Sequence, residues 1–140
     1  MKTLDEITGA VIDASMIIHK DLGPGLYESV YEMILERALQ KRGFKVERQK
    51  PVCFEYDGMV FDDAFRTDLL VEGVVVVELK SVERLLPVHA KQVLTYLRLM
   101  ELQVGLLINF GGATLKEGLQ RIVNNLKSED SLTIHLNRIL

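Results

Sequence analysis

This sequence contains a single cysteine, no tryptophan and no long apolar run. The lone cysteine, Cys53, excludes an internal disulfide and a cysteine-based zinc site. It lies in the strand-like run PVCFEY, where we expect a buried and unreactive thiol. The chain has no basic start followed by an apolar stretch, and nowhere do 18 apolar residues follow one another. We therefore expect a cytoplasmic protein with no membrane contact.

Positive charge is not in excess either, since the formal net charge is -3 and the pI is about 5.6. This balance argues against a generally basic nucleic-acid-binding surface but allows a local basic patch. Apolar residues make up 48% of the chain and charged residues 26%, which are ordinary globular values. We expect one domain over residues 1–140, with 126–140 as a mobile tail because it shows no clear period.

Helical spacing opens the chain and strand-like segments follow it. Ile7, Val11, Ala14 and Ile18 recur at helical spacing, and the Gly-Pro-Gly run after them breaks the pattern. The expected helices cover residues 4–20, 27–42 and 87–101. The expected strands lie in FKVERQ, VCFEYDGMVFDDAF, TDLLVEGVVVVELK and QVGLLINF, with a short last strand at 119–123.

The order of these elements predicts an α/β fold. A strand, the helix at 87–101 and the next strand form a crossover. We expect the two strands to be parallel and the connection between them to be right-handed. Asp57-Gly58 is a strong hairpin signal and Glu72-Gly73 a weaker one, so the other pairings are antiparallel. We therefore expect a three-layer sandwich with a mixed central sheet flanked by helices.

The segment DLLVEGVVVVELK ends a strand with Glu78 and Lys80, two residues apart. Residues at this spacing in a strand point to the same face, about 7 Å apart. The position of Asp68, on the preceding strand, depends on the hairpin register. A loop centred on Gly73 places Asp68 directly opposite Glu78, roughly 5 Å away. A two-residue loop, Glu72-Gly73, would place the two carboxylates on opposite faces.

An Asp and a Glu that converge at strand ends make a hard-oxygen site suited to Mg²⁺ or Mn²⁺. Like charges at this distance are destabilising unless a cation lies between them. A lysine beside them can orient or deprotonate an attacking water and stabilise charge on a phosphate. The alternative is that Glu78 and Lys80 form a surface ion pair at a frayed strand end.

The same residues carry a resemblance to a known family. The spacing of Asp68, Glu78 and Lys80 resembles the D-(about ten residues)-ExK signature of the PD-(D/E)XK nuclease superfamily. GLYESVY, residues 25–31, is similar to the GxxExxY pattern that names one family within it. The likeness covers roughly residues 10–125. It implies a restriction-endonuclease-like core of order α-β-β-β-α-β, which agrees with the order expected from periodicity.

The resemblance also implies roles for individual residues. Asp68 and Glu78 match the acidic metal ligands and Lys80 matches the catalytic lysine. The carbonyl of Leu79 often joins the metal shell in such proteins, and Glu28 matches a first-helix glutamate that reaches the ion directly or through water. The implied cofactor is Mg²⁺ or Mn²⁺.

Four further residues are candidate substrate contacts. Gln92 and Tyr96 match a QxxxY pattern found in related branches, and their spacing of four places both on one helix face. Tyr31 can bind Glu28 or substrate, with core packing equally compatible. Arg66 shares the strand face of Asp68, where it can contact a DNA backbone or neutralise the acidic cluster. The departure from the family pattern is Thr67, which stands where the name-giving proline precedes the aspartate.

Two other features have simpler interpretations. His19 ends the first predicted helix, where a capping or packing role is favoured over a ligand role. Asp62 and Asp63 form a second acidic pair, which we interpret as a solvated turn or bulge.

The leading hypothesis from the sequence is a metal-dependent nuclease that hydrolyses DNA. A second is a nuclease-fold module with little or no turnover that binds nucleic acid or a protein partner. A third is a structural α/β protein whose Glu78–Lys80 pair is only a surface ion pair. The small size of the chain is compatible with DNA recognition by a homodimer.

Overall fold

The computed structural model describes residues 1–125, so the expected tail at 126–140 lies outside the described part. The elements follow in the order α1 (Leu4–Leu22), α2 (Glu28–Lys41), β1 (Val46–Tyr56), β2 (Met59–Val71), β3 (Val75–Lys80), α3 (Pro87–Met100), β4 (Val104–Asn109), a short 3-10 turn η1 (Lys116–Gly118) and β5 (Leu119–Val123). The predicted helices differ from these by one or two residues at their ends. The last strand lies where it was expected.

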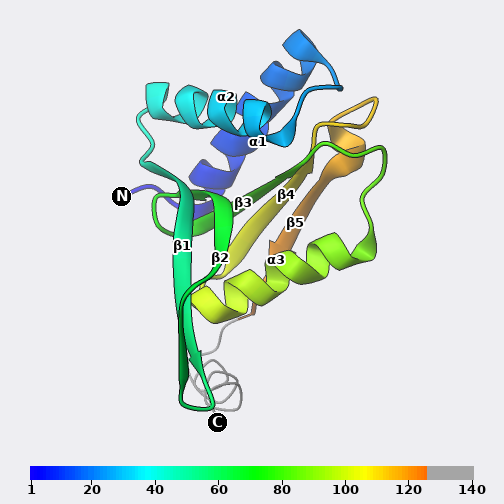
Figure 1. Cartoon of the computed structure of the whole chain (residues 1–140). Helices are drawn as coiled ribbons and strands as arrows, with labels where there is room; N and C mark the ends of the chain where they lie inside the picture. Colours follow the sequence, from blue (N-terminus) through cyan, green and yellow to red (C-terminus); the bar gives the residue numbers. More distant parts are fainter. Residues whose placement is uncertain (126–140) are drawn as a thin grey trace.

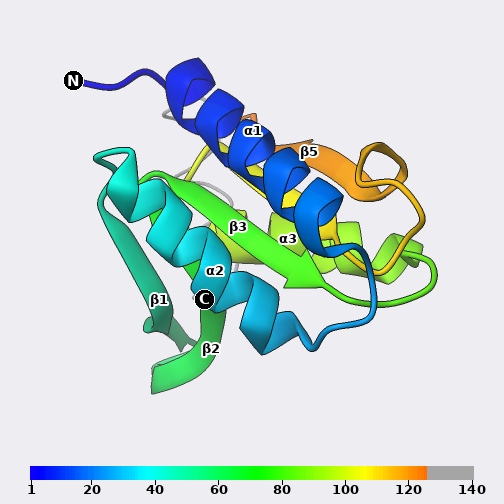
Figure 2. The same cartoon turned by 90° about the horizontal axis from the view of Figure 1, so that it is seen from above.

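The five strands within residues 1–125 form one mixed sheet in the order β1-β2-β3-β4-β5. Of these five strands, only β3 and β4 pair in parallel, and α3 connects them. Helices α1 and α2 cover one face of the sheet and α3 lies on the other (Figures 1 and 2). The predicted three-layer α/β sandwich is therefore confirmed, with the antiparallel pairs β1-β2, β2-β3 and β4-β5.

The central strands are buried because helices cover both of their faces. Along β3, alternate residues Val75, Val77 and Leu79 join a core cluster with α1 and α2, whereas Val76 joins a second cluster with α3. Every residue of β4 is buried. Burial on both faces explains why these strands read as continuous apolar runs in the sequence.

The far part of the β1–β2 hairpin, residues 53–63, projects beyond the other strands (Figure 1). Helices do not cover it, so several of its large apolar side chains are exposed: Tyr56, Met59, Val60 and Phe61. The prediction of a buried Cys53 is wrong, because the thiol lies on this projecting segment and is exposed. Opposite Cys53 the register shifts, so that Asp62, Asp63 and Ala64 of β2 face one residue of β1. The second acidic pair thus lies in an exposed bulge.

None of the helices within residues 1–125 combines the length and the apolar character needed to cross a bilayer.

Candidate active site

The β2–β3 hairpin has the register that brings Asp68 and Glu78 together. Its pairs are Leu69–Val77, Leu70–Val76 and Val71–Val75, which leaves a three-residue loop centred on Gly73. Both Glu72 and Gly73 adopt positive φ, at 53° and 70°. Continuing this register by one residue places Asp68 opposite Glu78, and it rules out the two-residue loop.

The backbone ladder ends at Leu69–Val77, and carboxylates take over its hydrogen bonds. The backbone N–H of Asp68 donates to Oε1 of Glu78 at 2.9 Å. In return, the N–H of Leu79 donates to Oδ2 of Asp68 at 2.8 Å. Each side chain therefore binds the backbone of the opposite strand. We call Asp68 and Glu78 the carboxylate pair.

Burial makes this pair electrostatically unusual. Burial raises the pKa of Glu78 to about 8, and the neighbouring Asp68 charge adds to the rise. The pKa of Asp68 is also raised, mainly by burial and then by the nearby charge of Glu32. Two such carboxylates cannot both be ionised at neutral pH at low cost. The pair must hold either a proton or a cation.

Lys80 lies beside the pair as the last residue of β3, and it is half-buried. Its positive charge acts on Glu78 and opposes the rise in the pKa of that carboxyl. Within residues 1–125, the Lys80 ammonium forms no ion pair or hydrogen bond. The surface ion pair that the sequence left open is therefore not formed, and the ammonium has donors to offer a ligand.

Glu32 belongs to the same cluster, although the sequence analysis did not include it. It is only 4% exposed, and its Oε1 accepts hydrogen bonds from Arg48 Nε at 2.9 Å and Gln49 Nε2 at 3.0 Å. Gln49 also donates to Oδ1 of Asp68 at 3.1 Å. This chain of contacts fixes Asp68 from the side of α2. The available signal was the spacing of four between Glu28 and Glu32, which places both on one face of α2.

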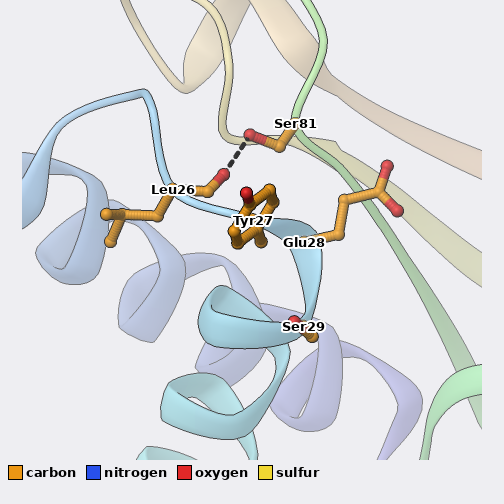
Figure 3. A pocket seen from close by; sticks show the side chains of 5 residues that line it. All are labelled: Leu26, Tyr27, Glu28, Ser29 and Ser81. Atoms are coloured by element: carbon orange, nitrogen blue, oxygen red, sulfur yellow. Dashed lines mark hydrogen bonds between the residues drawn. The ribbon is translucent and has the colours of Figure 1, made fainter.

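Glu28 lies at the first turn of α2 and is exposed. Its charge is close enough to contribute to the raised pKa of Asp68. It also lines an open pocket of about 470 Å³ with Leu26, Tyr27, Ser29 and Ser81 (Figure 3). Glu28 thus lies near the carboxylate pair but takes no part in the hydrogen bonds that hold Asp68 and Glu78.

The donor set fits a hard divalent ion. No three His, Cys, Asp or Glu side chains among residues 1–125 gather into a metal shell. Mg²⁺, however, usually takes only one or two protein carboxylates and keeps several waters. Asp68 and Glu78 are held together by backbone donors and carry raised pKa values, so a cation would replace the shared proton.

Helix α3 covers the sheet face that carries Val76 and, two residues further along β3, Glu78, so its residues Gln92 and Tyr96 lie on the same face as the pair. The Tyr96 ring stacks on Phe65, with centroids 4.2 Å apart and planes within 6°. Burial and the charges of Glu78 and Asp68 raise the pKa of the Tyr96 hydroxyl, and a hydrogen bond with Gln92 partly offsets the rise. Gln92 and Tyr96 therefore act as a linked pair near the carboxylates.

Tyr31 does not lie where a substrate could reach it, and its assignment as a substrate contact is corrected. It is fully buried and stacks on Phe110 with centroids 4.5 Å apart. Its hydroxyl donates to the carbonyl of Gly23 at 2.5 Å and accepts the N–H of Leu26 at 3.3 Å. The last residue of the GxxExxY pattern thus closes the loop between α1 and α2. Gly25 in that loop has φ 114°, which only glycine adopts readily.

Arg66 does not neutralise the carboxylate pair. Its guanidinium donates to both oxygens of Asp63, at 3.3 and 2.7 Å, on the exposed bulge. His19 is nearly buried, and its Nε2 contacts the carbonyl of Gly112 at 3.0 Å. The packing role favoured for this histidine agrees with that contact.

Comparison with known proteins assigns this chain to a family. The model of the PD-(D/E)XK nuclease superfamily matches residues 5–122. The chain belongs to the PD-(D/E)XK nuclease superfamily.

A solved structure supports the same fold. The structure described as "Crystal structure of SSO0001" superimposes with a TM-score of 0.54 at 20% identity. The match covers 81% of this chain and 61% of that chain, so this nuclease-superfamily chain spans less than two thirds of its relative. The search of curated proteins found no match.

Proposed function

We propose that this chain is a Mg²⁺- or Mn²⁺-dependent nuclease that hydrolyses DNA phosphodiester bonds at the carboxylate pair. The observation that carries the proposal is the end of the β2–β3 ladder. There, the buried Glu78 and the half-buried Asp68 each accept a hydrogen bond from the backbone of the opposite strand, the pKa of Glu78 is raised to about 8, and the Lys80 ammonium lies alongside. Such perturbed groups cluster at functional sites.

Asp68 and Glu78 would hold the ion, with the carbonyl of Leu79 and the carboxylate of Glu28 as further ligands. A bound divalent ion lowers the pKa of a coordinated water and polarises a phosphate oxygen. Lys80 would hydrogen-bond the attacking water or the phosphate, because its ammonium has no protein partner among residues 1–125. Its charge would stabilise the extra negative charge of the transition state.

Gln92 and Tyr96 would contact a phosphate from the α3 side. The stacking of Tyr96 on Phe65 fixes the ring, and the charges of both carboxylates act on its hydroxyl. Gln49 and Glu32 would act on Asp68 as positioning residues.

The test is a DNA-cleavage assay with matched lysine variants. The wild type should cleave DNA in Mn²⁺ or Mg²⁺ and not in a chelator. Lys80→Ala and Asp68→Ala should each lower the rate by roughly a hundredfold or more. Lys50→Ala is the control, since Lys50 is half exposed and pairs with Glu47. Wild-type rates in purified, folded Lys80→Ala would refute the assignment.

Calorimetric titration of Mn²⁺ separates the enzyme from the second candidate, a binding module without turnover. The net charge of -3 favours the module, because it leaves little positive surface to hold a duplex. Binding of Mn²⁺ that requires Asp68, together with no cleavage by the wild type, would assign the module instead.

A further inference from the structure

We propose that Tyr27 is a stacking platform for an unpaired nucleobase next to the scissile phosphate, so that the substrate is single-stranded or locally unpaired DNA. The inference rests on the proposed function, which locates the phosphate at the carboxylate pair. It adds the substrate form and a binding residue.

Tyr27 is the first observation. At 83% exposed, its ring makes almost no use of its apolar surface within the protein. It stands at the N-cap of α2, and no side chain caps that end of the helix. An isolated exposed tyrosine needs no explanation, but this one lies beside Glu28 on the wall of the 470 Å³ pocket (Figure 3).

The backbone just before Tyr27 is held unusually firmly for a loop. The N–H of Leu26 donates to the buried Tyr31 hydroxyl, and the carbonyl of Leu26 accepts from the Ser81 hydroxyl at 2.6 Å. Both backbone polar groups of Leu26 are thus bound by side chains from other parts of the chain. The backbone that carries the exposed ring is therefore positioned in advance, which lowers the entropy cost of binding a ligand.

These clamps also tie the pocket to the candidate active site. Ser81, which lines the pocket, directly follows Lys80 at the end of β3, and Glu28 lines the same pocket. A nucleotide whose phosphate lies at the carboxylate pair thus has its neighbour at the pocket mouth.

The chemistry of the pocket favours a base over a phosphate. Its lining has one charged residue, Glu28, and that charge is negative, with Leu26 and two serine hydroxyls beside it. The lining offers no cationic side chain to bind a phosphate, whereas its carboxylate and hydroxyl oxygens can accept hydrogen bonds from base amino groups. Bases inside a duplex are already stacked on both faces, so away from the duplex ends a base offers a face to Tyr27 when it is unpaired.

Binding measured without chemistry tests the inference. We would use Lys80→Ala in Mg²⁺ with a short single-stranded oligodeoxynucleotide that carries 2-aminopurine, and with the same sequence as a blunt duplex. Adding Tyr27→Ala should weaken single-strand affinity roughly ten- to a hundredfold and abolish the stacking-induced quenching of 2-aminopurine. Tyr27→Phe should retain both, because phenylalanine presents a similar face.

The control is Tyr56→Ala, which removes a 46% exposed tyrosine on the projecting hairpin and should change nothing. Equal single-strand binding with and without the Tyr27 ring would overturn the inference. So would an equal loss of duplex affinity, or no single-strand binding by the parent. Cleavage by the wild type is scored separately, so cleavage without a Tyr27 effect refutes this inference alone. Tyr27-dependent binding without cleavage refutes only the proposed function.

Discussion

The two ends of the β2–β3 hairpin are built in opposite ways. Near its turn, three pairs of apolar residues are joined by ordinary backbone hydrogen bonds and are almost fully buried. One residue further, Asp68 and Glu78 replace that ladder with hydrogen bonds from side chain to backbone. The turn end stabilises the fold, whereas the open end brings two carboxyl groups together where little water reaches them. Burial of the apolar pairs near the turn thus offsets the electrostatic cost of the carboxylate pair at the open end.

The largest expected loss of stability comes from a substitution near the turn of the β2–β3 hairpin. Leu69→Ala removes a fully buried side chain from the core and should lower the free energy of unfolding by about 2–5 kcal/mol. Glu78→Gln is the matched change at the open end, where Gln can still accept the N–H of Asp68. It should cost far less, because it removes a buried charge. Chemical denaturation at pH 8 measures both, and equal losses would contradict the comparison.

The next effect is a pH dependence that only the open end should show. Glu78 has a folded pKa of about 8, above its ordinary value of 4.5, so between these values the folded state holds a proton that the unfolded state has lost. Stability should therefore fall as the pH rises from about 5 to 9, by at most a few kcal/mol. Thermal unfolding of the metal-free protein measures it. Glu78→Gln should flatten the curve, and parallel curves for the two proteins would reject this assignment.

A substitution at Glu32 tests the open end separately, because Glu32 on α2 contacts Asp68 through Gln49. Glu32→Gln leaves Arg48 without its anionic partner, and loss of a charge-assisted hydrogen bond should cost about 1–3 kcal/mol of stability. It also removes a charge that raises the pKa of Asp68, so the midpoint of Mn²⁺ binding should move to lower pH. Calorimetry across pH tests this shift. A purely structural role would leave the midpoint unchanged, as should the control Glu36→Gln on the same helix.

The sequence predicted the two carboxylates at the open end of the β2–β3 hairpin but not the residues that contact them. Alternation along the strands, a local property, left two hairpin registers open, and the structure has the one centred on Gly73 that brings Asp68 opposite Glu78. Glu32 and Gln49 were not predicted, since their contact depends on how α2 lies across β1. Gln49 also has a positive φ of 54° inside a strand, which no local pattern indicates.

The errors elsewhere have a similar cause. Cys53 was expected to be buried because PVCFEY reads as a strand, and it is a strand. Burial depends on whether another layer covers that strand, and the β1–β2 hairpin extends past both helix layers. Tyr31 shows the converse, since a motif residue expected near substrate is fully buried as a clamp on the loop.

The smallest expected effect concerns Arg66, which lies on β2 two residues before Asp68. Its guanidinium is already bound through two hydrogen bonds to Asp63, and both side chains are about half exposed. Exposed pairs of this kind contribute little to stability, so Arg66→Ala should leave thermal unfolding essentially unchanged. DNA affinity should also be unchanged, including its salt dependence, because Asp63 already neutralises this charge. If Arg66 did contact a phosphate, the slope of log affinity against log salt would fall by about one in the variant. A measured fall would place the DNA along the bulge of β2, and it would return Arg66 to the substrate contacts.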